Sequence, residues 1–148
     1  MAIPSCLLDT NVLLRISRQS DPEQRLVHHA LDELSAQDTV FYYTHRNIAE
    51  LWNVMTRPIA RNGLGLSVAK AEQEVIAIER GMDLLPENEF VYREWRRLLL
   101  QYSISGVQVY DARLVAAMHV HEVRTILTLN VPDFQRFADI NVMHPADV

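Results

Sequence analysis

The feature that most constrains this chain is its regular alternation between short apolar runs and longer segments with helical periodicity. The short runs are rich in β-branched and aromatic residues, which is typical of buried strands. The longer segments repeat an apolar residue every three or four positions, which is typical of amphipathic helices. The predicted strands cover residues 3–8, 39–44, 124–129 and 140–144, and the predicted helices cover residues 21–36, 45–57, 68–81, 90–102 and 109–121. This alternation predicts an α/β fold, a three-layer α/β/α sandwich with a central, mostly parallel β-sheet.

Residues that favour helix ends flank most of the predicted helices. Ser20 is the predicted N-cap of the first helix, because a proline and a glutamate follow it at the positions typical of a helix start. Ser67 and Asn88 are predicted to cap two later helices. Pro58 ends the second helix, since proline cannot continue the backbone hydrogen bonding. The segment 59–66, with its two glycines, is therefore predicted to be a loop.

The composition fits one globular domain over residues 1–148. Its 49% hydrophobic and 22% charged residues are close to the average for such domains. Asp9 interrupts the first apolar run and no basic segment precedes it, so we expect neither a signal peptide nor contact with a membrane. The single cysteine, Cys6, cannot form an internal disulfide, which favours a reducing compartment and a cytoplasmic location.

Acidic residues carry the candidate chemistry. The formal net charge of -5 argues against a general nucleic-acid binder, because such proteins usually present a basic surface to phosphates. Excess carboxylate is instead what a site for hard divalent cations requires. Four acids lie just after predicted strands or near the start of helices, where parallel α/β sheets bind ligands: Asp9, Glu50, Asp111 and Asp133. Taken singly, each is also compatible with a turn, a helix cap or an ion pair.

Four segments spread over the whole chain contain these acids: LLDTNVLL, NIAELWNVMTRP, GVQVYDARLVAAM and ILTLNVPDF. Together they resemble the motifs of the PIN-domain nucleases, in particular the VapC-like toxins of bacterial toxin-antitoxin pairs. The resemblance implies a PIN-like fold and a Mg2+- or Mn2+-dependent endoribonuclease that cleaves RNA phosphodiester bonds. Metal ions would neutralise charge that carboxylates alone cannot, since carboxylates repel phosphate.

Residue by residue, the resemblance implies that Asp9, Glu50 and Asp111 hold the metal ion and carry catalysis. The fourth position is open between Asn130, as a neutral metal ligand, and Asp133, as a further acid. The resemblance also implies polar neighbours that orient the carboxylates, and these are Thr10, Asn11 and Thr128. The sequence departs from many relatives at Tyr110, where they have a histidine.

RNA is the implied substrate, and guanidinium groups suit its phosphates because they donate two hydrogen bonds in a fixed fork. Arg15 and Arg57 are the candidate contacts, since they lie near the acids in the sequence. The resemblance further implies a cognate antitoxin that inserts a peptide across the site, and a homodimer. The candidate dimer interface is formed by apolar helices around Trp52, Leu64 and Tyr102.

Three alternatives stay open. The first is a catalytically weak PIN-fold module that binds RNA or a protein partner, because Asn130 weakens the fourth position. The others are a phosphatase with Asp9 as nucleophile and a receiver-like signalling domain. Both would need a lysine at a strand end, whereas Lys70, the only lysine, lies in a predicted helix. The phosphatase would also need an aspartate where Asn11 stands.

Overall fold

The computed structural model describes residues 2–148 and contains a five-stranded sheet in which all neighbouring strands are parallel. Its strands are β1 (Ser5–Leu8), β2 (Val40–Tyr43), β3 (Asp83–Leu84), β4 (Thr125–Leu127) and β5 (Asn141–Met143). Their spatial order is β3-β2-β1-β4-β5, so β1 lies at the centre. The α/β fold expected from the sequence is confirmed.

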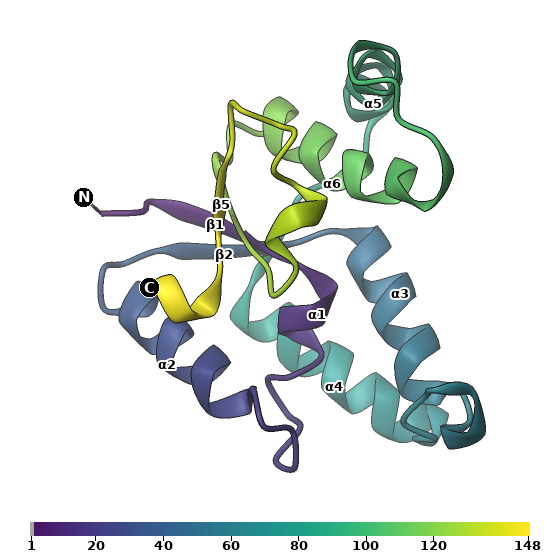
Figure 1. Ribbon diagram of the computed structural model, residues 1–148. Helices are drawn as coiled ribbons and strands as arrows, with labels where there is room; N and C mark the ends of the chain where they lie inside the picture. Colours follow the sequence, from purple (N-terminus) through teal and green to yellow (C-terminus); the bar gives the residue numbers. More distant parts are fainter. Residues whose placement is uncertain (1) are drawn as a thin grey trace.

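Helices cover both faces of this sheet (Figure 1). One face carries α1 (Thr10–Leu13), α2 (Gln24–Ser35), α3 (His45–Thr56) and α4 (Val68–Gly81). The other face carries α5 (Glu89–Gln101) and α6 (Val109–Val120). Short 3-10 turns lie at Ile59–Arg61, Gly106–Gln108, Val131–Asp133 and Pro145–Asp147.

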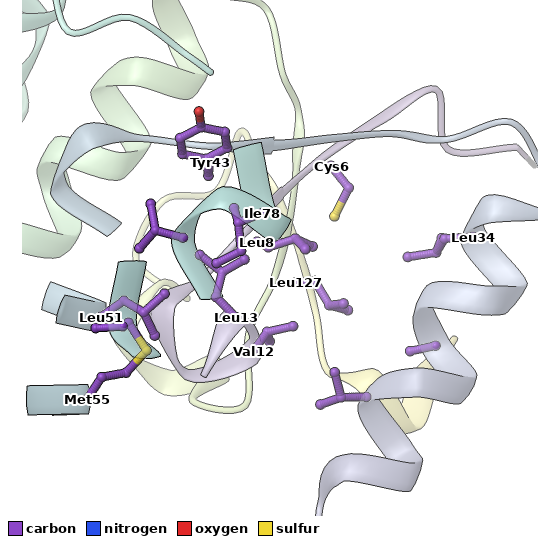
Figure 2. Packing of buried hydrophobic residues seen from close by; sticks show 14 residues of the cluster. Cys6, Leu8, Val12, Leu13, Leu34, Tyr43, Leu51, Met55, Ile78 and Leu127 are labelled. Atoms are coloured by element: carbon purple, nitrogen blue, oxygen red, sulfur yellow. The ribbon is translucent and has the colours of Figure 1, made fainter. Parts of the chain in front are cut away.

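Two apolar cores separate the sheet from its helices. Successive side chains of a strand point to opposite faces, and accordingly Leu8 packs in the core under α1 to α4 while Leu7 packs under α5 and α6. Figure 2 shows the first core gathered around Leu8, Leu13 and Leu127. Because β1 is buried on both faces, its sequence is a continuous apolar run. Asp9 directly follows the carboxyl end of this strand.

The predicted caps are confirmed at two helices and wrong at one. The Ser67 hydroxyl accepts a hydrogen bond from the Lys70 amide at 3.1 Å, and Asn88 accepts two from the first turn of α5. Ser20 caps nothing, because α2 begins only at Gln24 and Glu23 makes no side-chain cap.

The reason for the late start of α2 lies in the preceding turn. There the Asp21 carboxylate accepts a hydrogen bond from the Glu23 amide at 2.9 Å and forms ion pairs with Arg15 and Arg18, both at 3.4 Å. These contacts hold the chain in a turn over residues 18–23, so helical geometry begins after it.

Two short elements were not predicted. The helix α1 spans four residues directly after β1, which is too short to show helical periodicity. The strand β3 spans two residues and pairs with the edge of β2 through Asp83 and Leu84. The remaining strands are shorter than predicted, since β4 has three residues within the predicted 124–129. All strands being parallel, the sheet is also more regular than the mostly parallel one expected.

The side chains proposed for a dimer interface are used largely within the protomer. Trp52 and Leu64 pack against the first core, and Tyr102 packs against the second with its ring edge-on to Phe137 at 5.1 Å. Within residues 2–148, no helix has the length and apolar character needed to cross a bilayer.

Candidate active site

The site lies where the order of the strands changes direction. After β1 the chain adds β2 and β3 on one side and then returns to add β4 and β5 on the other. At such a switch point the loops after neighbouring strands diverge and leave room for a ligand. Asp9 directly follows β1 and Thr128 directly follows β4, and the Asp9 amide donates to the Leu127 carbonyl at 3.0 Å.

Asp9 is held by three donors around its carboxylate. Its Oδ1 accepts from the Thr10 amide at 2.8 Å, so Asp9 is also the N-cap of α1. Its Oδ2 accepts from the Thr128 hydroxyl at 2.8 Å and from Asn11 Nδ2 at 3.2 Å. Asn11 in turn accepts from the Leu129 amide at 3.1 Å. The polar neighbours named from the sequence therefore fix the rotamer of Asp9 and join the ends of β1 and β4.

Glu50 reaches the site from α3. Its Oε2 accepts from the Thr10 hydroxyl at 3.2 Å and forms a close ion pair with Arg46. Thr10 is itself positioned by Asn47, whose Nδ2 donates to the Thr10 hydroxyl at 3.0 Å. A chain of hydrogen bonds thus connects α3 to the residue beside Asp9, although the Glu50 side chain stays 43% exposed.

Asn47 is fully buried and has a second role, which the sequence reasoning missed. The side-chain oxygen of Asn47 accepts a hydrogen bond from the backbone amide of Thr44 at 2.9 Å. The backbone amide of Asn47 donates to the Thr44 hydroxyl at 3.2 Å. Together these two hydrogen bonds form a capping box at the start of α3. The available signal was a threonine followed three residues later by an amide side chain. One residue therefore sets both the start of α3 and the contact with Thr10.

Asp111 lies in the first turn of α6, and the charges of the other acids change its pKa. Burial and, after it, the negative charges of Asp9, Asp133 and Glu50 raise its pKa to about 7, although the positive charge of Arg46 lowers it in part. Burial also raises the pKa of Asp9, which the hydrogen bonds from Thr128 and Thr10 only partly offset. The charges of Asp9, Glu50 and Asp133 therefore all act on Asp111, in keeping with the strand-end argument.

The two candidates for the fourth position are coupled to each other. Asn130 is exposed, its Nδ2 donates to Asp133 Oδ2 at 2.5 Å, and its amide donates to the Thr128 hydroxyl at 3.0 Å. Asp133 is the one whose charge acts on Asp111. This arrangement favours Asp133 as the fourth acid and Asn130 as the residue that positions it.

The arginines named from the sequence are engaged elsewhere. Arg15 donates to the Asn11 carbonyl at 2.8 Å and lies beside Asp21 and Glu23, whereas Arg57 donates to the Asn62 carbonyl at 2.9 Å within the loop after α3. The guanidinium whose charge reaches Asp9 and Asp111 is that of Arg46. Its place at the first turn of α3, directly after a strand, was the signal available in the sequence.

The carboxylates fit a divalent cation bound in part through water. Burying several acids together raises their pKa values, and a cation is what removes that cost. Within residues 2–148, however, no three acidic, imidazole or thiol side chains are gathered tightly enough to ligate one ion directly. Magnesium suits such a site, since it usually keeps several waters and is held by only one or two carboxylates.

A parallel α/β sandwich with acids at the switch point of its sheet presents a carboxylate-lined place for a ligand. This chain belongs to the PIN domain family, whose model matches residues 6–140. The match covers every acid of the site and the strands β1 to β4, and it ends just before β5.

Solved structures with the same fold cover nearly the whole chain. The structure of FitAB bound to the IR36 DNA fragment is 24% identical, with a TM-score of 0.66 over 97% of this chain and 96% of that one. VapBC2 from Rickettsia felis, bound to a DNA fragment from its promoter, is 14% identical, with a TM-score of 0.67 over 95% and 98%.

A third structure is Mycobacterium tuberculosis VapC20, described as a toxin that cleaves the sarcin-ricin loop. It is 14% identical, with a TM-score of 0.60 over 82% of this chain and 86% of that one. Among curated proteins, no sequence matches this chain. At these identities the structures establish the shared fold, and the chemistry has to be argued from the site itself.

Proposed function

We propose that this protein is a Mg2+- or Mn2+-dependent endoribonuclease and the toxin of a toxin-antitoxin pair. The observation that carries the proposal is the convergence of Asp9, Glu50, Asp111 and Asp133 at the switch point of the sheet, where burial and the charges of the other acids raise the pKa of Asp111 to about 7. The PIN domain family and the VapC20 toxin support a nuclease that acts on RNA. The free, buried Cys6 is in keeping with a cytoplasmic protein.

Asp9 and Asp111 are the proposed direct ligands of the cation. Asp9 is suited to this role because Thr128, Thr10 and Asn11 hold its carboxylate in one orientation without neutralising it. A bound cation would neutralise charge on the phosphoryl oxygens and lower the pKa of an attacking water. The protein's own contribution is to hold carboxylates in fixed positions at the carboxyl ends of the strands.

Glu50 and Asp133 complete the proposed site from opposite sides. Glu50 is held by Arg46 and Thr10, so its carboxylate is placed to orient water at the cation. Asp133 is held by Asn130 and adds negative charge beside Asp111. We propose that both act through water, because three direct protein ligands are not gathered within residues 2–148.

An antitoxin is the protein partner that we propose. The FitAB and VapBC2 structures share this fold over nearly their whole length and are bound to DNA fragments. A further structure with this fold, a toxin-antitoxin complex from Klebsiella pneumoniae, has a TM-score of 0.66. A homodimer remains part of this proposal as well.

The surface that fits an antitoxin segment is a hollow of about 660 Å³ between α1, α3 and α4. Its floor is apolar, with Leu13, Met55 and Leu64, and its rim carries Lys70 and Glu74. An apolar segment with charges of both signs at its edges would match it. We expect Lys70→Glu, on the exposed rim, to weaken inhibition of cleavage by the antitoxin, while leaving cleavage itself unchanged.

The test of the nuclease is cleavage of a mixed set of structured RNAs by the purified protein, with Mg2+ or Mn2+ and with EDTA. Asp9→Asn is the variant, and Asp32→Asn on the exposed face of α2 is the matched control. We expect cutting that needs the metal, is lost in Asp9→Asn and is kept in Asp32→Asn. RNA binding without any cutting would contradict the proposal and favour the scaffold module.

A further inference from the structure

A second hollow adjoins the acidic site and has no role in the mechanism above. It has a volume of about 520 Å³ and lies between the first turns of α3 and α6, which Figure 1 shows next to each other. Arg46 and Glu50 line it, and both also belong to the acidic site. Tyr110 lines it too and immediately precedes Asp111. A group bound in this hollow would therefore sit beside the proposed reaction centre.

Tyr110 offers this hollow a flat aromatic surface. Its side chain is 47% exposed, which is unusual for a residue at the start of a largely buried helix. The guanidinium carbon of Arg46 lies 5.3 Å from the centre of the Tyr110 ring, and Arg46 is held in turn by Glu50. This cation-π contact helps to fix the position of the ring.

Two residues that line this hollow carry a buried polar atom without a partner. Among residues 2–148, five buried side-chain nitrogen or oxygen atoms make no hydrogen bond, and two of them are Arg46 Nε and Glu87 Oε1. Both atoms lie beneath the surface of the hollow, so a ligand would meet the exposed parts of these side chains instead. The lining therefore offers guanidinium donors and carboxylate acceptors to a ligand.

The charges in the hollow are nearly balanced. Arg46 pairs with Glu50, and Arg113 pairs closely with Glu87. A phosphate group would gain little here, because each guanidinium already faces a carboxylate. An uncharged planar group with polar edges fits better, and in an RNA substrate that group is a nucleobase, which stacks on aromatic side chains and hydrogen-bonds along its edge.

We propose that this hollow binds one unpaired base of the RNA, next to the cleaved phosphate, with the base stacked on Tyr110 and its edge among the polar side chains that line the hollow. The proposal rests on the ribonuclease function proposed above and adds the kind of substrate. Because a base inside a duplex cannot expose its face, the RNA must be single-stranded or splayed out at this nucleotide.

The test compares the affinity for two oligomers of about ten nucleotides, which is within the usual length bound by single-strand sites. One is fluorescein-labelled oligoadenylate, and the other has the same backbone with abasic sugars throughout. Both are titrated in Mg2+ against protein that carries Asp9→Asn, so that no cutting takes place. Tyr110→Ala and Tyr110→Phe are then added to this background.

We expect Tyr110→Ala to raise the Kd for oligoadenylate on the order of 5- to 150-fold, as for other bases stacked on an aromatic ring, and to leave the Kd for the abasic oligomer unchanged. Tyr110→Phe keeps the ring and should stay near the parent. The matched control is Tyr92→Ala on α5, which removes another exposed tyrosine with an arginine over its ring, Arg96 at 5.9 Å, and which does not line the hollow.

Equal losses for both oligomers, or equal effects of Tyr110→Ala and Tyr92→Ala, would overturn the base-binding site and leave the nuclease intact. If the parent binds neither oligomer and the wild type cuts no RNA, the proposed function fails and this inference with it. A change of oligomeric state in Tyr110→Ala, measured by light scattering, would also overturn the proposal, since the hollow would then be part of a protein interface.

Discussion

Asp111→Asn should make the metal-free protein more stable at pH 8 while it removes a proposed metal ligand. Burial and the neighbouring acids raise the pKa of Asp111 from 3.8 to about 7, so the folded state disfavours its charged form. At about 1.36 kcal/mol per pKa unit, the difference sets an upper bound of about 4 kcal/mol. Since the side chain is only partly buried, solvent screening reduces the expected gain to on the order of 1–2 kcal/mol.

The gain should depend on pH in a defined direction. Above pH 7 Asp111 is charged in both the folded and the unfolded chain, and the full penalty of the folded state applies. As the pH falls from about 7 towards 4, the folded state binds the proton first and the penalty disappears. Asp111→Asn should therefore raise Tm by roughly 2–8 °C at pH 8 and have almost no effect near pH 4.

The assay is thermal and urea unfolding in EDTA at both pH values, with Asp32→Asn as the control, because that residue lies on the exposed face of α2. Mg2+ should then stabilise the wild type and not Asp111→Asn, since ligands stabilise only the state that binds them. Equal gains at pH 8 and pH 4, or a loss of stability at pH 8 in EDTA, would refute the reasoning from repulsion among the acids.

Three further changes probe the supports of the site and the fold. Thr128→Val removes the hydroxyl that donates to Asp9 and should cost about 1–3 kcal/mol in urea unfolding, because a buried carboxylate loses a donor. Gly63→Ala should destabilise by about 1–3 kcal/mol, since its Cβ would lie 1.9 Å from the Arg57 carbonyl oxygen. Burial raises the pKa of the Cys6 thiol to about 12, so a thiol reagent at pH 8 should label it only when the protein unfolds.

Each of these predictions has a control on the same chain. Gly81→Ala, at the end of α4, meets open space and should leave the stability unchanged or slightly higher. Thr56→Val removes a hydroxyl that bonds only to the Trp52 carbonyl of its own helix, and should cost less than Thr128→Val. Rapid labelling of Cys6 in the folded protein would contradict its burial. If Gly63→Ala left the stability unchanged, the loop before α4 would have to shift at little cost in free energy to make room for the added Cβ.

The sequence predicted four of the five strands and the places of the acids, because both depend on local patterns. A buried central strand has to be apolar at every position, so the run before Asp9 is recognisable, and a carboxylate that follows it stands at the edge of the sheet. The caps at Ser67 and Asn88 were predictable for the same reason, since the capping side chain and its partners are two or three residues apart.

The rest of the site depends on contacts between distant parts of the chain. Nothing local couples Asn47 to Thr10, 37 residues away, or Thr128 to Asp9, 119 residues away. The failure at Ser20 has a similar cause, because ion pairs from Arg15 fix the turn before α2. Arg15 and Arg57 were named as RNA contacts because they lie near the acids in the sequence, whereas the arginine whose charge acts on the acids is Arg46.

The central claim is that acids from separate strand ends form one cation site, and calorimetric titration with Mn2+ tests it without knowledge of the RNA. The account predicts that the wild type binds Mn2+ and that Asp32→Asn binds it with the same affinity. Asp9→Asn and Asp111→Asn should each lose affinity on the order of tenfold or more, since each removes a charged ligand. Equal affinity in all four proteins, or no binding by the wild type, would contradict it.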